Sequence, residues 1–220
     1  FEPSRGGACR CGSGSAVMSV GSSSATGHAH AQQPQQQEDQ EDLFPPDNFS
    51  MVDAGIYRSS FPMKKHFPFL RKLGLRTILT LVIEELPPAN LDFVQAHGIR
   101  LVQIGVEGNK EPFKYIPLEE VRFAVREMSD ASNHPMLVHC NKGKHRTGCF
   151  IGCFRRTQGW AVSSIFEEYS HFASPKARLV DQRYIELFEP EGEDAASKKS
   201  VLTSRIWISE PADPPGKLAR

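Results

Sequence analysis

The sequence predicts one α/β domain over residues 43–188, with a central, mostly parallel sheet flanked by helices. Short apolar runs alternate with helical periods through this region, and Gly or Pro residues separate them. The run TILTLVI at 77–83 is apolar and β-rich, as is typical of a parallel strand buried on both faces. Strands that alternate with helices in this way pack into a parallel sheet with helices on both sides.

The first half of the domain supplies three strands and two helices. GIYRSS is a short strand, and KKHFPFLRKLG is a helix that Gly74 ends. TILTLVI follows as the buried strand. Two prolines then precede ANLDFVQAHG, a helix with Gly98 just past its end, and IRLVQIGV is the next strand. The predicted elements are strand 55–60, helix 64–74, strand 77–83, helix 89–98 and strand 99–106.

The second half contains a loop, one more strand and four helices. The loop over 105–116 leads to Pro117, which suits a helix start, and apolar residues then recur at spacings of three and four along one face. PMLVHC is a strand, and a turn containing Gly and Lys separates it from the next helix. The predicted elements are helix 117–128, strand 135–140, and helices 147–159, 162–172 and 178–188.

Both ends of the chain are poor in the apolar residues that a folded domain needs. Residues 21–42 contain no Val, Ile, Leu, Met, Phe, Trp, Tyr or Cys. Residues 189–220 are rich in Pro, Ser and charge, with VLTSRIWIS at 201–209 as their one apolar run. Such segments bury too little apolar surface to offset their chain entropy. We therefore expect disordered tails over 1–42 and 189–220.

The composition narrows the classes of function. The 26 basic and 26 acidic side chains leave no net charge, which argues against nucleic-acid binding as the main role. No apolar run reaches the ~20 residues that a membrane span requires. Five Cys residues, three of them within 140–153, do not make a disulfide scaffold and suit a reducing compartment. A cytoplasmic location is expected, with the nucleus left open.

One loop, HCNKGKHRTG at 139–148, carries the predicted chemistry. It lies between a predicted strand and a predicted helix, and ligands in such folds bind at the carboxyl ends of the strands. The backbone N–H groups of a tight loop and the N-terminus of the following helix stabilise an anion. This field favours the thiolate of Cys140 and would also hold the oxygens of a bound phosphoryl group. Cys140 is therefore the predicted nucleophile.

The other residues of the loop have complementary roles. Arg146 offers a planar fork that suits two phosphoryl oxygens, which a Lys would not. Gly143 lets the backbone approach the ligand. The Thr147 hydroxyl can donate to the Cys140 sulfur when that sulfur is the leaving group. His139 is expected to order the loop through hydrogen bonds and not to transfer protons.

The spacing of Cys and Arg is not sufficient by itself. Cys149 and Arg155 repeat it, but they lie inside a predicted helix with no strand before them. The strand–loop–helix context is what makes the first match specific. We expect Cys149 and Cys153, four residues apart on that helix, to be core residues.

The loop and its surroundings resemble a known family. HCNKGKHRTG followed by CFIGCFRR resembles the signature of Cys-dependent phosphatases, and within them the plant and fungal atypical dual-specificity phosphatases, the Siw14-like group. The similarity also covers NFSMVDAGIYRSSFP at 48–62, VEGNKEPF at 106–113 and FASPKARLVDQRYIELF at 172–188. The resemblance implies a Cys-phosphatase-like fold and catalysis through a phosphocysteine, with no metal or cofactor. It also implies hydrolysis of inositol pyrophosphates, chiefly of the β-phosphate at position 5.

The charges around the loop bear on the class of substrate. Residues 141–156 contain five Lys or Arg and no acid, although the whole chain is neutral. A single phosphoryl group needs only the loop and Arg146, so the extra cations indicate a small ligand with several phosphates. The predicted substrate-binding residues are Asn109, Lys110, Asn141, Lys142, Gly143, Lys144, His145 and Arg146.

A general acid is not evident in the sequence. The loop over 105–116 has no Asp, and its carboxylates are Glu107 and Glu111, of which Glu107 is our candidate. A phosphoanhydride has a leaving group of low basicity that departs with little protonation, so a weak acid agrees with a pyrophosphate substrate. We expect Asp181 to be structural instead, in an ion pair with Arg183 or a loop residue.

Three alternatives remain open at this point. A dual-specificity protein tyrosine or phosphoinositide phosphatase uses the same chemistry, and phosphoproteins would then be partners. A rhodanese-like sulfurtransferase also holds a Cys in an anion-binding loop, although the Arg-Thr-Gly run into a helix favours phosphoryl transfer. A phosphate-binding module without activity would fit a chain in which Cys140 or Arg146 is replaced, and neither is.

Overall fold

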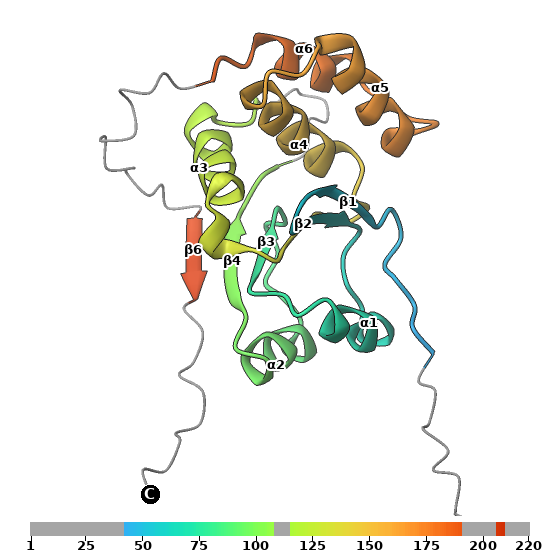
Figure 1. Cartoon of the computed structure of the whole chain (residues 1–220), viewed down its shortest axis with the longest axis vertical. Coiled ribbons are helices and arrows are strands. Elements are labelled where there is room, and N and C mark those ends of the chain that lie inside the picture. Colours follow the sequence, from blue (N-terminus) through green and yellow to red (C-terminus); the bar gives the residue numbers. More distant parts are fainter. Residues whose placement is uncertain (1–41, 108–114, 191–205, 210–220) are drawn as a thin grey trace, which may run out of the picture. The chain divides into compact units, whose positions relative to one another are not determined.

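The computed structural model of the chain describes residues 42–107, 115–190 and 206–209. Six strands form a single sheet in the order β1-β2-β5-β3-β4-β6 (Figure 1). The four central strands are parallel to one another, and the two edge strands are antiparallel to their neighbours. The strands are β1 Ser50–Asp53, β2 Ile56–Ser59, β3 Thr77–Thr80, β4 Arg100–Ile104, β5 Met136–His139 and β6 Ile206–Ser209.

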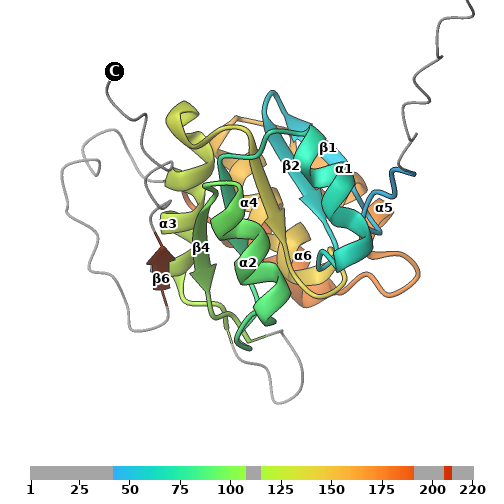
Figure 2. The ribbon, with the colours of Figure 1, turned by 90° about the horizontal axis from the view of Figure 1, so that it is seen from below.

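Helices cover both faces of this sheet. Helices α1 and α2 lie across one face, as the view in Figure 2 shows, and helices α3 to α6 lie on the other. Each face has its own hydrophobic cluster, one built with α1 and α2 and one with α3 to α6. The helices are α1 Phe67–Lys72, α2 Pro88–Ala96, α3 Leu118–Ser129, α4 His145–Thr157, α5 Val162–Ala173 and α6 Leu179–Leu187, with short 3-10 turns η1 Lys64–His66 and η2 Ala131–Asn133.

The predicted α/β fold with a mostly parallel sheet is confirmed. The run at 77–83 supplies β3, whose four residues are all buried, in the middle of the sheet. The strand ends at Thr80, three residues before the end of the run, and Ile83 at the end of the run is exposed. Leu81 and Val82 nevertheless stay buried, and the Leu81 N–H donates to the His139 carbonyl at 2.8 Å.

Both edge strands were missed by the sequence patterns. The expectation of disorder over 189–220 is wrong for Ile206–Ser209, which pair with β4 as β6. Their N–H and C=O groups complete the ladder at that edge of the sheet, and Ile206 and Ile208 pack against the core. Nearly all of the other residues of the two expected tails lie outside the described residues. In the described part of the chain, no helix has the length and apolarity to cross a membrane.

Candidate active site

The predicted catalytic loop lies at the carboxyl end of β5. β5 ends at His139 and α4 begins at His145, with Cys140 between them and only 3% exposed. β5 has β2 on one side and β3 on the other, so the ends of both strands flank the loop. On the β2 side, the Phe61 N–H donates to the Asn141 carbonyl at 3.2 Å. The loop is thus held between the two neighbouring strand ends.

Gly143 is required by a close contact with the end of β2. Its φ is +65°, in the left-handed region, and a Cβ there would lie 2.5 Å from the carbonyl carbon and oxygen of Ser59. The sequence predicted that this glycine lets the backbone approach a ligand. The approach that the structure shows is to the Ser59 backbone, so Gly143 seats the loop against the sheet.

Arg146 is oriented by backbone carbonyls. Its Nη1 donates to the carbonyls of Leu81 at 2.7 Å and Val106 at 3.0 Å, which follow β3 and β4. Both bonds use Nη1, so Nε and Nη2 can form a fork toward two oxygens of one phosphoryl group. The sequence predicted the fork, and the two strand ends supply its support.

Thr147 and His139 are both buried beside the loop. The Thr147 Oγ1 has no hydrogen-bond partner within the described ranges. Burial lowers the pKa of His139 to about 4, although a backbone hydrogen bond with Cys140 opposes the shift. The imidazole is therefore neutral at pH 7 and packs edge-on against the Phe61 ring. A neutral ring is a poor general acid at pH 7, and its Nδ1 has no hydrogen-bond partner within the described ranges.

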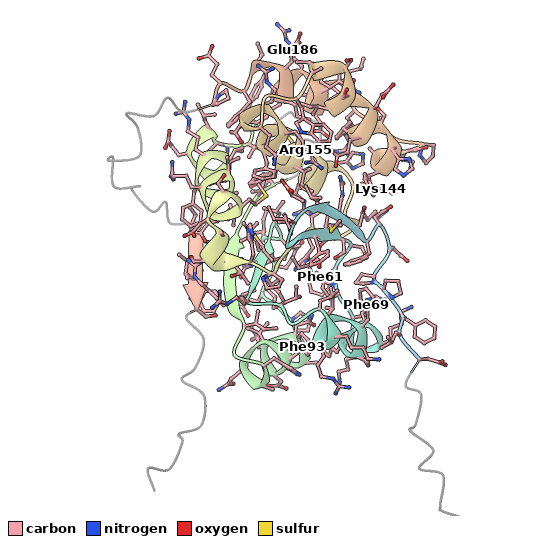
Figure 3. All side chains as sticks on the ribbon, viewed as in Figure 1. Phe61, Phe69, Phe93, Lys144, Arg155 and Glu186 are labelled. Atoms are coloured by element: carbon pink, nitrogen blue, oxygen red, sulfur yellow. The ribbon has the colours of Figure 1, made fainter. Side chains whose placement is uncertain are left out.

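Lys144 and His145 contact the segment that joins α5 to α6. Lys144 Nζ donates to the Ser174 carbonyl, and His145 Nε2 lies 2.6 Å from the Lys176 carbonyl. Figure 3 shows Lys144 beside the start of α4. Burial lowers the pKa of His145, so its ring is neutral at pH 7. These two side chains hold the start of α4 to the segment between α5 and α6, which we call the rim of the site.

The remaining residues of this region differ in position. Asn141 and Lys142 are exposed on the loop, and the Lys142 carbonyl accepts a hydrogen bond from Asn48. Arg155, one of the five cations counted at 141–156, is instead buried in an ion pair with Glu168 at 3.0 Å. It belongs to the core packing of α4 and α5 and not to the rim.

The candidate acid follows β4. Glu107 is half-buried and directly follows Val106, whose carbonyl accepts from Arg146, so the chain brings it close to the loop. Asn109, Lys110 and Glu111 lie outside the described residues.

Asp181 lies in a buried, structural position. It is buried and accepts a hydrogen bond from the Tyr169 hydroxyl at 2.6 Å. Arg183 pairs with Glu186. The same Tyr169 hydroxyl accepts from the Arg178 N–H at 3.2 Å, so this pair helps to hold the segment between α5 and α6.

The cysteines of α4 are core residues, as predicted. Cys149 and Cys153 are fully buried. A hydrogen bond with Cys153 and burial both raise the pKa of Cys149, which disfavours a thiolate there. In the described ranges, no three His, Cys, Asp or Glu side chains are grouped so that they could hold a metal ion.

The sequence patterns did not single out Arg58, which contacts the catalytic loop. Its guanidinium is buried and its Nη2 donates to the Gly143 carbonyl at 2.9 Å. The available signal was a charged residue inside the short apolar strand IYRS, where side chains are expected to be buried.

Comparison with known proteins identifies the family. Residues 43–206 match the model of the tyrosine phosphatase family. The chain belongs to this family. Its membership confirms the resemblance to Cys-dependent phosphatases that the loop predicted, and it disfavours the sulfurtransferase.

Within the tyrosine phosphatase family, the chain is similar to inositol diphosphatases. Inositol diphosphatase DSP1 of Oryza sativa subsp. japonica is 52% identical over 147 residues, which is 67% of this chain and 66% of the rice protein. Inositol diphosphatase SIW14 of Saccharomyces cerevisiae is 49% identical over 169 residues, 76% of this chain and 58% of the yeast protein. The chain thus spans about two thirds or less of these curated relatives.

A solved structure agrees with the fold. The structure of the Siw14 catalytic core matches with a TM-score of 0.65 and 49% identity, and the match covers 67% of this chain and 88% of that one. The Siw14-like resemblance of the sequence is therefore confirmed in both sequence and structure.

Proposed function

We propose that this protein is a phosphatase that removes the β-phosphate of inositol pyrophosphates through a phosphocysteine at Cys140, without a metal and with a preference for the 5-position. The observation that carries the chemistry is the buried Cys140 in a loop whose Arg146 is oriented by two strand ends. The similarity to proteins named inositol diphosphatases supports the substrate class.

The reaction has two steps. The Cys140 thiolate attacks the β-phosphorus, an S–P bond forms, and the P–O bond to the inositol phosphate breaks. Water then attacks the same phosphorus, the S–P bond breaks, and orthophosphate and the Cys140 thiolate are released. Arg146 binds two oxygens of the transferred group in both steps, and Thr147 donates to the sulfur as it leaves.

The leaving group explains why a weak acid is enough. A phosphate leaving group carries its own negative charge well and needs little proton assistance, whereas an alkoxide needs a proton. Glu107 is the acid that we propose for the site. The neutral His139 takes no part in this proton transfer.

Substrate binding is divided between the rim and the loop. Lys142 is the exposed loop cation and would contact a further phosphate of the inositol ring, where a charge-assisted hydrogen bond contributes on the order of 1–3 kcal/mol. Lys144 and His145 act by holding the segment after α5. Asn109 and Lys110 remain predicted contacts.

The decisive experiment compares substrates. Orthophosphate release is measured from inositol pyrophosphates, phosphoinositides and phosphotyrosine peptides, with Cys140→Ser as the inactive control and EDTA as the test of the metal-independent reaction. We expect the highest kcat/KM for an inositol pyrophosphate and no effect of EDTA. A higher kcat/KM for a phosphopeptide or a phosphoinositide would show the alternative phosphatase function instead.

The exposed loop cation, Lys142, gives a second readout in the same assay. Lys142→Ala should raise KM for the inositol pyrophosphate but not for an aryl phosphate, and the effect should shrink as salt is added. Lys72→Ala is the matched control, since Lys72 is an exposed lysine of α1 on the other face of the sheet. Equal effects of Lys142→Ala on both substrates would argue against a polyphosphate ligand.

A further inference from the structure

Arg58 is a buried arginine that contacts the catalytic loop from outside it. It lies in β2 and is paired in register with Val138 of β5, two residues before Cys140. The residue is 1% exposed. Burying a charge costs several kcal/mol unless its partners replace the lost water, so the partners of Arg58 show what the residue does.

Those partners are few. Nη2 donates to the Gly143 carbonyl, and the guanidinium carbon lies 3.7 Å from the ring centre of Phe172 near the end of α5. In the part of the chain that the structure describes, Nε and Nη1 have no hydrogen-bond partner. Buried donors that make no hydrogen bond lower the stability of the fold. Local features that cost stability are typical of functional positions.

Arg58 keeps its positive charge in this environment. Burial lowers its pKa to about 10, and attraction to Glu168 and Cys140 works against that shift. A pKa of about 10 leaves the guanidinium protonated at pH 7. The loop therefore has a fixed positive charge behind it, bonded to its Gly143 carbonyl. A buried positive charge favours a negative charge close to it.

The bond to Gly143 also sets the direction of a loop N–H. The C=O and N–H of one trans peptide point in opposite directions. A Gly143 carbonyl held toward the buried Arg58 turns the Lys144 N–H to the opposite side of the loop. An anion-binding loop needs its N–H groups on that open side.

We propose that Arg58 is a positioning residue, which holds the Gly143 carbonyl so that the loop keeps its anion-binding conformation and whose buried charge favours the thiolate of Cys140. This inference rests on the proposed function, because it takes Cys140 as the nucleophile. It adds to the loop a residue from a different strand, 82 positions before Cys140 in the chain.

The test measures the reactivity of Cys140 without substrate. The full chain is alkylated with iodoacetamide at a series of pH values. Mass spectrometry then measures the alkylation of the Cys140 peptide separately from that of the peptides with the other cysteines. We expect Arg58→Met to raise the midpoint of this pH profile by about one unit or more and to lower kcat on an aryl phosphate on the order of 10²-fold. Arg58→Lys keeps the charge, so its midpoint should stay within about half a unit while kcat falls about 10-fold.

Arg155→Met is the matched control. Arg155 is also a buried arginine of this core, but its bonds run to Glu168, Gln158 and the Val52 carbonyl. Its removal should lower thermal stability and leave the alkylation midpoint as in the wild type. A midpoint shift as large as that of Arg58→Met would make the effect one of core stability and overturn the proposal.

The other outcomes are equally decisive. A folded Arg58→Met variant with the wild-type midpoint overturns the role of the charge, and an unchanged kcat in Arg58→Lys overturns the role of the carbonyl. If Arg58→Met does not fold, the lysine variant decides, and a midpoint raised by a unit or more despite the retained charge contradicts the proposal. A wrong substrate assignment would look different, since wild-type Cys140 would alkylate as expected while inositol pyrophosphates released no phosphate.

Discussion

Replacing Gly143 by Ala should damage the catalytic loop far more than it damages the fold. An alanine at this position adopts a left-handed φ of +65°, which costs about 1–2 kcal/mol. Its Cβ would also lie 2.5 Å from the Ser59 carbonyl group, where ordinary contacts begin at 3.4 Å. Backbone cannot rotate away as a side chain can, so the loop must move by about 0.9 Å.

The displacement predicts the size of the effect on catalysis. A shift of about 1 Å in a catalytic group can cost 10²-fold in rate. Overpacking adds about 1–3 kcal/mol to the conformational cost, so the free energy of unfolding should fall by roughly 2–5 kcal/mol in total. We expect kcat on an aryl phosphate to fall about 100-fold, measured beside a denaturant titration.

Gly98→Ala separates the two contributions. Gly98 has nearly the same φ, +59°, but a Cβ there would meet nothing within 4 Å. It should therefore lose about 1–2 kcal/mol of stability and keep its kcat. A Gly143→Ala variant with wild-type kcat, or a Gly98→Ala variant as inactive as Gly143→Ala, would refute the reasoning.

Two further predictions follow from the site. Arg146→Lys should lower kcat on the order of 10²-fold, because an ammonium cannot bond both strand-end carbonyls and still present a fork to the phosphoryl oxygens; near-normal kcat would remove Arg146 from the mechanism. Burial lowers the pKa of His139 from an ordinary 6.5 to about 4. Between pH 4 and pH 6.5 the imidazole is therefore protonated in the unfolded chain and neutral in the folded chain. The free energy of unfolding should therefore fall on acidification from about pH 6.5 to 4, by about 3 kcal/mol at most from this residue. In His139→Gln, the free energy of unfolding, measured by denaturant titration, should depend less on pH over this range. An unchanged pH dependence would show that the imidazole is protonated in the folded protein as readily as in the unfolded chain.

The parts of the fold that depend on a segment's own residues could be predicted from the sequence. TILTLVI predicts a strand buried on both faces because five of its seven side chains are aliphatic, and the four residues of β3 are all buried. The catalytic loop could be predicted for a similar reason, since the chemistry proposed for Cys140 and Arg146 calls for these residue types at a fixed spacing. These signals are local to the segment.

The parts that depend on a distant partner could not be predicted. Ile206–Ser209 form β6 because they pair with the edge of β4 and because Ile206 and Ile208 pack on the core. Neither contact can be seen in the segment itself. The carbonyls of Leu81 and Val106 orient Arg146, but every residue has a carbonyl, so their identity gives no signal.

The same dependence on distant partners explains why the positions of Lys144 and Arg155 could not be predicted. Lys144 has the chemistry of a phosphate ligand, and the sequence cannot show that the Ser174 carbonyl, 30 residues later, lies within reach of its ammonium. Arg155 was counted with the rim cations for the same reason, although its partner Glu168 holds it in the core. Charge counts along a chain therefore overestimate the charge that faces a ligand.

The central claim is that Cys140 accepts the β-phosphoryl group of an inositol pyrophosphate. The most direct measurement is a rapid quench of the wild-type reaction with an inositol pyrophosphate radiolabelled in its β-phosphate, followed by peptide mapping. We predict transient label on the Cys140 peptide, orthophosphate release at a matching rate, and neither in Cys140→Ser. Label on another residue, or orthophosphate release by Cys140→Ser at the wild-type rate, would contradict the mechanism.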